Sequence, residues 1–160
     1  MTGSQKLEQT WETPSLEDIP VISRAHVAAL EAGDDDETWT PSGQVLVLLH
    51  TVGRKSGKEH KVPLPMWRDA GGHRIVVASY AGAPHHPAWF LNLEANPEVE
   101  FQVGAKKYRG EARSVDGAEH DRLYKFMEGV FPPYTAYQAR TERKIPVVVL
   151  EPKAEIERLA

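Results

Sequence analysis

The sequence has no cysteine among its 160 residues. Disulfide bonds, zinc–thiolate sites, iron–sulfur clusters and thiol nucleophiles are therefore excluded. No apolar run approaches the length of a membrane span, and the first residues lack the basic and apolar regions of a signal peptide. A formal net charge of −4 leaves no broad basic face for nucleic acid. We therefore expect a cytoplasmic protein that does not bind nucleic acid.

Two common catalytic signatures are also missing. The seven histidines show no ligand spacing such as HExxH, which argues against a metal site. No GxSxG sequence is present, so nucleophilic hydrolysis has no support either. We expect neither a metal site nor a serine hydrolase.

What is present is the composition of one globular domain. The chain is 41% hydrophobic and 26% charged, which is ordinary for a folded protein of this length. Residues 1–20 differ from the rest, because they hold one basic residue, Lys6, against four acidic ones. We expect a flexible acidic N-terminal arm over residues 1–20 and a single domain over residues 21–160.

The hydrophobic pattern predicts six short strands, mostly joined by hairpins, over residues 44–51, 61–67, 74–80, 99–103, 107–115 and 145–150. Helices are predicted over residues 22–32, from Pro87 to the stop at Asn96-Pro97, behind Asp116, and over residues 134–143. This order lacks the regular βαβ alternation of a parallel sheet. We predict an α+β fold in which a six-stranded antiparallel β-barrel has helices packed outside.

The second predicted strand contains two prolines, Pro63 and Pro65. They are two residues apart, so both missing N–H groups lie on the same side of the strand. That side cannot be paired inside a sheet. We expect it to be an edge or to face a ligand.

A basic loop connects the first two predicted strands. One acid, Glu59, stands there against four cations: Arg54, Lys55, Lys58 and Lys61. Gly53 and Gly57 flank Arg-Lys-Ser and allow the backbone to turn and offer N–H groups beside these side chains. The loop is either a polyanion site or a solvated hairpin turn. A P-loop is excluded, because only three residues separate the two glycines and Lys58 is followed by an acid.

Aromatic residues gather around the Pro132-Pro133 break, where Phe131, Tyr134 and Tyr137 follow at helical spacing. Most aromatic side chains belong to the core. A pocket that stacks a planar ligand would use the same residues, since a tyrosine supplies an apolar wall and a polar tip. Both interpretations stay open at this point.

Seven motifs in chain order carry a family resemblance. They are Gly53-Arg-Lys-Ser-Gly57, the Pro63 and Pro65 strand, Ala78-Ser-Tyr-Ala-Gly-Ala-Pro84, His86-Pro-Ala-Trp-Phe-Leu-Asn92, Ala95-Asn-Pro97, Pro132-Pro-Tyr-Thr-Ala-Tyr-Gln138 and Ile145-Pro-Val147. Over roughly residues 43–152 the chain resembles the deazaflavin-dependent nitroreductase family. The resemblance implies a split β-barrel of the FMN-binding type. It also implies reduced coenzyme F420, a 5-deazaflavin with a phosphate and an oligoglutamate tail.

The resemblance also implies roles for individual residues. The coenzyme tail would be held by Arg54, Lys55, Ser56, Gly57 and Lys61. The deazaflavin ring would be lined by Pro63, Pro65, Met66, Ser79, Tyr80, Ala81 and Gly82, and the site would be closed by His86, Pro87, Trp89 and Asn92. Tyr134 and Tyr137 match tyrosines over the ring face. They are the expected catalytic residues, and protonation would come from a tyrosine or from solvent.

The implied activity is hydride transfer from reduced F420 to an electron-poor planar substrate: a quinone, a nitroaromatic compound or an unsaturated lactone. Two alternatives remain: an FMN-dependent reductase on the same fold, and a non-catalytic carrier of the coenzyme or of a tetrapyrrole. The acidic arm departs from members with basic, membrane-seeking N-termini, because anionic lipid would repel it. Peripheral membrane association and the oligomeric state are left open.

Overall fold

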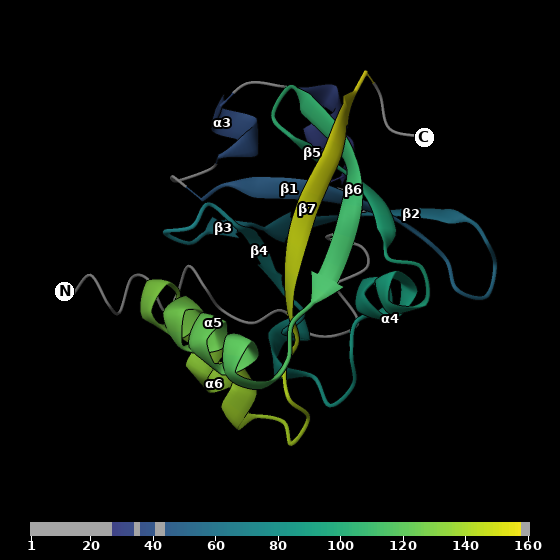
Figure 1. The fold of residues 1–160 in the computed structure, drawn as a ribbon. Coiled ribbons are helices and arrows are strands. Elements are labelled where there is room, and N and C mark those ends of the chain that lie inside the picture. Colours follow the sequence, from purple (N-terminus) through teal and green to yellow (C-terminus); the bar gives the residue numbers. More distant parts are fainter. Residues whose placement is uncertain (1–26, 34–35, 41–43, 158–160) are drawn as a thin grey trace.

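The computed structural model describes residues 27–33, 36–40 and 44–157, and its fold is α+β (Figure 1). All strand pairs are antiparallel, and the sheet order is β2-β1-β5-β6-β7-β4-β3. The strands are β1 (Leu46–Val52), β2 (Glu59–Pro65), β3 (Trp67–Arg68), β4 (Arg74–Val77), β5 (Glu98–Val103), β6 (Lys106–Ser114) and β7 (Val147–Ile156). The acidic arm predicted over residues 1–20 lies outside the described residues.

The helical elements after β1 are η2 (Tyr80–Gly82), α4 (Ala88–Ala95), α5 (Gly117–Val130) and α6 (Pro133–Ala139). Before β1, residues 27–32 are helical, within the predicted 22–32, and α3 (Asp36–Trp39) follows. In Figure 1, α5 and α6 (green) lie together at one end of the sheet, and α4 lies on its other side. No helix in the described part of the chain is both long and apolar enough to cross a membrane.

The sheet has seven strands and not the six predicted, because the second predicted strand is divided in two. β2 pairs with β1 up to Pro65, whereas β3 pairs with β4 from Trp67 onward. Between them, the N–H of Met66 donates to Val45 O (3.0 Å). The two ends of the strand order are therefore consecutive parts of one segment, and the sheet curls on itself.

Two other predicted elements also differ from the structure. The third strand ends at Val77, three residues before the predicted 80, and the chain then turns through η2. The last strand runs to Ile156, where residue 150 was predicted. Its register with β6 shifts between Arg109 and Gly110, and the backbones approach so closely there that a side chain at Gly110 would collide with the Glu151 carbonyl oxygen.

Two apolar cores lie on opposite faces of β7. Val148 and Leu150 belong to the core inside the curl, and Val147 and Val149 belong to the core under α5 and α6. Side chains of a strand alternate between faces, so a strand buried on both sides is a continuous apolar run. This explains why the first four residues of β7 are branched and apolar, whereas the exposed second half of the strand carries charged side chains.

Strand β2 lies at the end of the sheet order and pairs only with β1. Pro63 and Pro65 are therefore on an edge strand, which confirms the interpretation of their spacing. The free side of this edge is where the candidate site begins.

Candidate functional site

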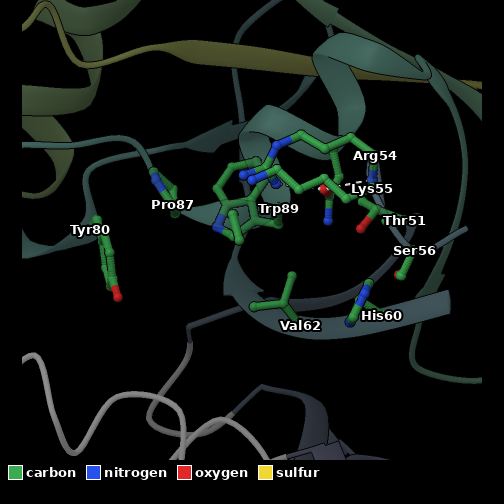
Figure 2. A pocket seen from close by; sticks show the side chains of 12 residues that line it. Thr51, Arg54, Lys55, Ser56, His60, Val62, Tyr80, Pro87 and Trp89 are labelled. Carbon is green, nitrogen blue, oxygen red and sulfur yellow. Dashed lines mark hydrogen bonds between the residues drawn. The ribbon is translucent and has the colours of Figure 1, made fainter. Parts of the chain in front are cut away.

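Two adjoining pockets lie between the β2 edge, the η2 turn and α4. We call the first the basic pocket (about 330 Å³; Figure 2). It is lined by Thr51, Gly53, Arg54, Lys55, Ser56, His60, Val62, Tyr80, Pro87, Ala88, Trp89 and Asn92. We call the second the aromatic pocket (about 270 Å³). It is lined by Val62, Pro63, Leu64, Pro65, Val77, Ser79, Tyr80, Ala81, Pro87, Trp89, Phe131, Tyr134 and Tyr137. Four residues line both pockets, so the two form one continuous site: Val62, Tyr80, Pro87 and Trp89.

The loop of the basic pocket is closed by its own backbone. Gly53 N–H donates to Lys58 O (2.7 Å), and Gly57 N–H donates to Gly53 O (2.9 Å). Gly57 has a φ of +71°, which favours glycine. A Cβ at Gly53 would lie 2.7 Å from Ser56 Oγ and 2.9 Å from His60 Nε2, so a larger residue would displace these two side chains of the basic pocket. Both glycines are needed to build a turn this tight.

Asn92 fixes the first cation of the loop. Its side chain is buried, and Oδ1 accepts hydrogen bonds from Arg54 N–H (3.2 Å) and from Arg54 Nη1 (2.9 Å). The bond from the guanidinium is charge-assisted and therefore stronger than a neutral one. Figure 2 shows this contact beside Lys55 and Trp89 in the basic pocket. The amide of α4 thus holds Arg54 in place before any ligand binds.

Thr51 is a candidate binding residue that the sequence did not reveal. Its side chain is only 1% exposed, and Oγ1 has no hydrogen-bond partner within the described residues, although Thr51 lines the basic pocket. A buried hydroxyl without a partner costs about 1–3 kcal/mol. Because Oγ1 exposes less than 1 Å² of surface, a ligand oxygen would remove that cost only after neighbouring atoms shift. The only sequence signal was the position of Thr51 at the end of a strand before the basic loop.

Lys61 and Gly57, both expected to hold the tail, do not line either pocket. The neighbours of Lys61 on β2, His60 and Val62, line the basic pocket, so Lys61 lies on the opposite face of the strand. There its Nζ is 2.6 Å from Glu31 Oε2. Gly57 shapes the loop, as described above.

The aromatic pocket is bordered by an unusual turn. Tyr80, Ala81 and Gly82 have φ angles of 45°, 54° and 79°, and only the last is a glycine. Left-handed conformations of other residues cost of order 1–3 kcal/mol each. At Gly82 a Cβ would lie 2.7 Å from the Tyr137 carbonyl oxygen. Gly82 is therefore packed behind the turn against α6, and it does not line the pocket.

Two arginines after α6 hold this turn, and neither was predicted as a site residue. Arg140 Nη1 donates to Ala81 O (3.0 Å). Arg143 donates to the carbonyls of Ala78, Ser79 and Ala83, and its Nη1 lies 3.0 Å from His86 Nδ1. Their role depends on residues about sixty positions away. No local pattern could have shown it.

Two further residues expected at the site lie behind it. His86 contacts Arg143 and Phe90 and lines neither pocket. Burial, followed by the Arg143 charge, lowers the pKa of His86, which suits a neutral ring that accepts at Nδ1. Met66 belongs to the core inside the curl. Both support the pocket walls from the rear.

The two predicted catalytic tyrosines meet in the aromatic pocket, with ring centroids 6.1 Å apart. Tyr134 is 4% exposed. Its hydroxyl accepts from Trp67 Nε1 (3.1 Å), and its carbonyl accepts from the Tyr124 hydroxyl (2.7 Å). Burial raises the pKa of Tyr134, so its hydroxyl stays protonated. Tyr137 is half-buried, with the Arg140 guanidinium 5.9 Å from its ring centroid.

The described residues contain no group of three or more His, Cys, Asp or Glu side chains placed to hold a metal ion. The basic pocket offers two cations, Arg54 and Lys55, beside the hydroxyl of Ser56. The next compartment has apolar and aromatic walls. Such a site suits an elongated ligand with an anionic tail and a planar head.

The family model for F420H(2)-dependent quinone reductases matches residues 22–152. The chain belongs to this family. An F420H(2)-dependent quinone reductase of Mycobacterium tuberculosis is 41% identical over 113 residues, which cover 69% of this chain and 75% of the relative. These matches confirm the family resemblance carried by the seven motifs.

Two solved structures are also similar. The F420-H2 dependent reductase FDR-A is 41% identical, with a TM-score of 0.59, over 66% of this chain and 93% of that one. A domain-swapped dimer is 40% identical, also with a TM-score of 0.59, over 72% of this chain and 90% of that one. Together with the curled antiparallel sheet, they confirm the predicted split-barrel type of fold.

Proposed function

We propose that the protein is an F420H2-dependent reductase that transfers a hydride to quinones. Family membership supports both the coenzyme and the substrate class. The observation that carries the proposal is the direct connection between the basic pocket and the aromatic pocket. F420 has the matching shape, since an anionic tail is joined to a planar ring.

The basic pocket fits the tail of the coenzyme. Arg54 and Lys55 supply charge for a phosphate or carboxylate, and Ser56 supplies a hydroxyl at the same loop. The unpartnered Thr51 hydroxyl provides a further donor. Phosphate and carboxylate oxygens accept hydrogen bonds, so these donors match them. Lys61 would take part only after leaving Glu31.

The aromatic pocket fits the ring and a stacked substrate. Pro63 and Pro65 offer a flat wall without N–H donors, and Ser79, Tyr80 and Ala81 border it opposite the tyrosines. When bound, F420H2 supplies hydride donation from the deazaflavin C5. The walls hold the substrate against that carbon and exclude water, which contributes positioning.

The tyrosine hydroxyls are placed to handle the proton. Hydride addition to a quinone leaves a negative charge on a substrate oxygen, and one proton completes the hydroquinone. Tyr134 keeps its proton because burial raises its pKa, and the Trp67 N–H orients its oxygen. Tyr134 Oη is therefore a neutral hydrogen-bond donor toward that oxygen. Tyr137 offers a second hydroxyl in a more exposed position.

The test is a titration of the purified protein with F420 and with FMN, followed by absorbance. We expect F420 to bind more tightly, because two cations beside the loop donors exceed what the single phosphate of FMN needs. Equal affinity for the two would contradict the proposal. Steady-state oxidation of F420H2 by a quinone then separates an enzyme from a carrier, which would bind without turnover. A nitroaromatic compound and an unsaturated lactone extend the test to the other substrates that the family resemblance implies.

A further inference from the structure

Arg143 is a cation whose contacts are carbonyl groups and one imidazole. It follows α6 and lies behind the turn that borders the aromatic pocket. Nε donates to Ala83 O (2.8 Å), and Nη2 donates to Ser79 O (2.7 Å). Nη1 donates to Ala78 O (3.2 Å) and to His86 Nδ1 (3.0 Å). The planar guanidinium therefore holds three carbonyls at and beside the turn and also contacts the His86 ring.

No carboxylate in the described residues forms an ion pair with Arg143. Arg113, by contrast, pairs with Glu119 at 2.9 Å. Buried charges are usually paired, because removing a charge from water is costly. Burial lowers the pKa of Arg143, which reflects that cost. Arg143 is half-buried, and Glu94 acts on the neighbouring His86, but the groups in contact with the guanidinium are three carbonyls and an imidazole. A positive potential therefore remains behind the pocket wall.

The same carbonyls determine where the turn's N–H groups point. In a trans peptide unit the C=O and N–H are antiparallel, and none of the described bonds is cis. The carbonyls of Ala78 and Ser79 point to Arg143, so the N–H groups of Ser79 and Tyr80 point away from it. Ser79 is right-handed (φ −73°) and Tyr80 is left-handed. This sequence of conformations makes a concave, anion-attracting set of N–H groups.

These features lie beside the aromatic pocket, because Ser79, Tyr80 and Ala81 line it. We propose that Arg143 is a positioning residue that gives the aromatic pocket its preference for an anionic planar ring. It does so by fixing the Ser79–Ala83 turn and by holding an uncompensated positive charge behind it. This inference rests on the proposed function and names a charge state of the ligand at the same site.

The first measurement is the affinity of a deazaflavin that lacks the phosphate and glutamate tail. We expect Arg143→Gln to weaken its binding at least tenfold, and to weaken F420 by the same factor. Arg54→Ala should weaken F420 alone, because the tail-less ring does not reach the basic pocket. Arg122→Gln is the matched control, since it removes an exposed arginine on α5 and should change neither affinity.

The second measurement is the ionisation of the bound ring, whose 8-hydroxyl changes the absorbance when it loses a proton. The Arg143 charge should lower the midpoint of this titration in the wild type. Arg143→Gln should raise the midpoint by about one pH unit, because the loss of a nearby positive charge disfavours the anionic form of the ring. Arg143→Lys keeps the positive charge but loses the several N–H donors of the guanidinium that hold the turn. The midpoint of the titration should therefore stay near the wild-type value while the affinity for the ring falls. A structural role alone would not move the midpoint.

The outcomes are distinct. If Arg143→Gln binds the tail-less ring with wild-type affinity, or loses affinity with an unchanged midpoint, the inference is wrong and Arg143 only stabilises the fold. If Arg143→Gln does not fold, Arg143→Lys decides, because unchanged affinity there contradicts the proposal. If the wild-type protein binds neither deazaflavin, the proposed function itself fails.

Discussion

Replacing Tyr134 with phenylalanine tests the centre of the proposed mechanism. The change keeps the aromatic wall and removes a single hydroxyl, which accepts from Trp67 Nε1 at 3.1 Å. It leaves the backbone bond from Tyr124 to Tyr134 O intact. Coenzyme affinity should therefore hold while turnover falls.

The size of the fall identifies the role of the hydroxyl. A neutral positioning hydrogen bond contributes about 0.5–1.5 kcal/mol, which corresponds to roughly tenfold in rate. Loss of a general acid costs a factor of about 10² or more. We expect the turnover rate to fall at least tenfold in Tyr134→Phe and by a smaller factor in Tyr137→Phe. Tyr137 is more exposed, so water can more easily take the place of its hydroxyl. The variant should also be less stable by about 1–3 kcal/mol, since the Trp67 N–H loses its acceptor.

The assay is steady-state oxidation of F420H2 at saturating coenzyme, with a quinone and then a nitroaromatic compound. The two substrates take up protons at different positions, so a tyrosine that donates a proton should affect them unequally. Tyr108→Phe is the control, because Tyr108 lies on β6 and lines neither pocket. Alanine at Tyr134 or Tyr137 should also raise KM, since stacking area is lost. If the phenylalanine and alanine variants of both tyrosines all turn over at the wild-type rate with unchanged KM, the substrate site is misplaced.

Three further results are expected. Arg54→Ala and Lys55→Ala should each weaken F420 binding by about 1.5–3 kcal/mol, and more so at low salt; an unchanged Kd in the double variant places the tail elsewhere. His86 has a pKa lowered from 6.5, so the folded protein binds fewer protons than the unfolded chain just below that pH. Stability should therefore fall as the pH drops below 6.5 through the folded pKa, and His86→Gln should flatten this part of the Tm profile. Removing residues 1–20 should leave the fold intact, and a Tm many degrees lower would show that the arm is part of the core.

Features that depend on neighbouring residues could be predicted from the sequence. The edge position of β2 followed from the spacing of Pro63 and Pro65, because a missing N–H acts within its own strand. The tight basic loop followed from two glycines around three polar residues. The last strand followed from the apolar run that ends at Leu150, although the strand continues to Ile156. In each case the physical cause lies within about ten residues of the effect.

Features that depend on tertiary contacts could not be predicted from the sequence. The division of β2 from β3 falls at Met66, whose N–H donates to the carbonyl of Val45, the residue before β1. The pairing of Lys61 with Glu31 joins residues thirty positions apart and turns an expected tail ligand to the other face. The left-handed turn at Tyr80 and Ala81 is held by arginines about sixty positions later. A continuous apolar run before this turn therefore looked like a longer strand.

The shared wall of the two pockets explains why the motifs are spread so widely along the chain. Val62 comes from the β2 edge, Tyr80 from the η2 turn, and Pro87 and Trp89 from the start of α4. A ligand that fills both pockets makes favourable contacts in each but loses its translational freedom only once. Its affinity therefore exceeds that of the tail alone or of the ring alone. In the proposed complex, the tail would anchor the molecule through Arg54, which Asn92 holds in place. The contacts in the aromatic pocket can then serve mainly to orient the ring, because the binding energy of the remote tail holds the ring in place.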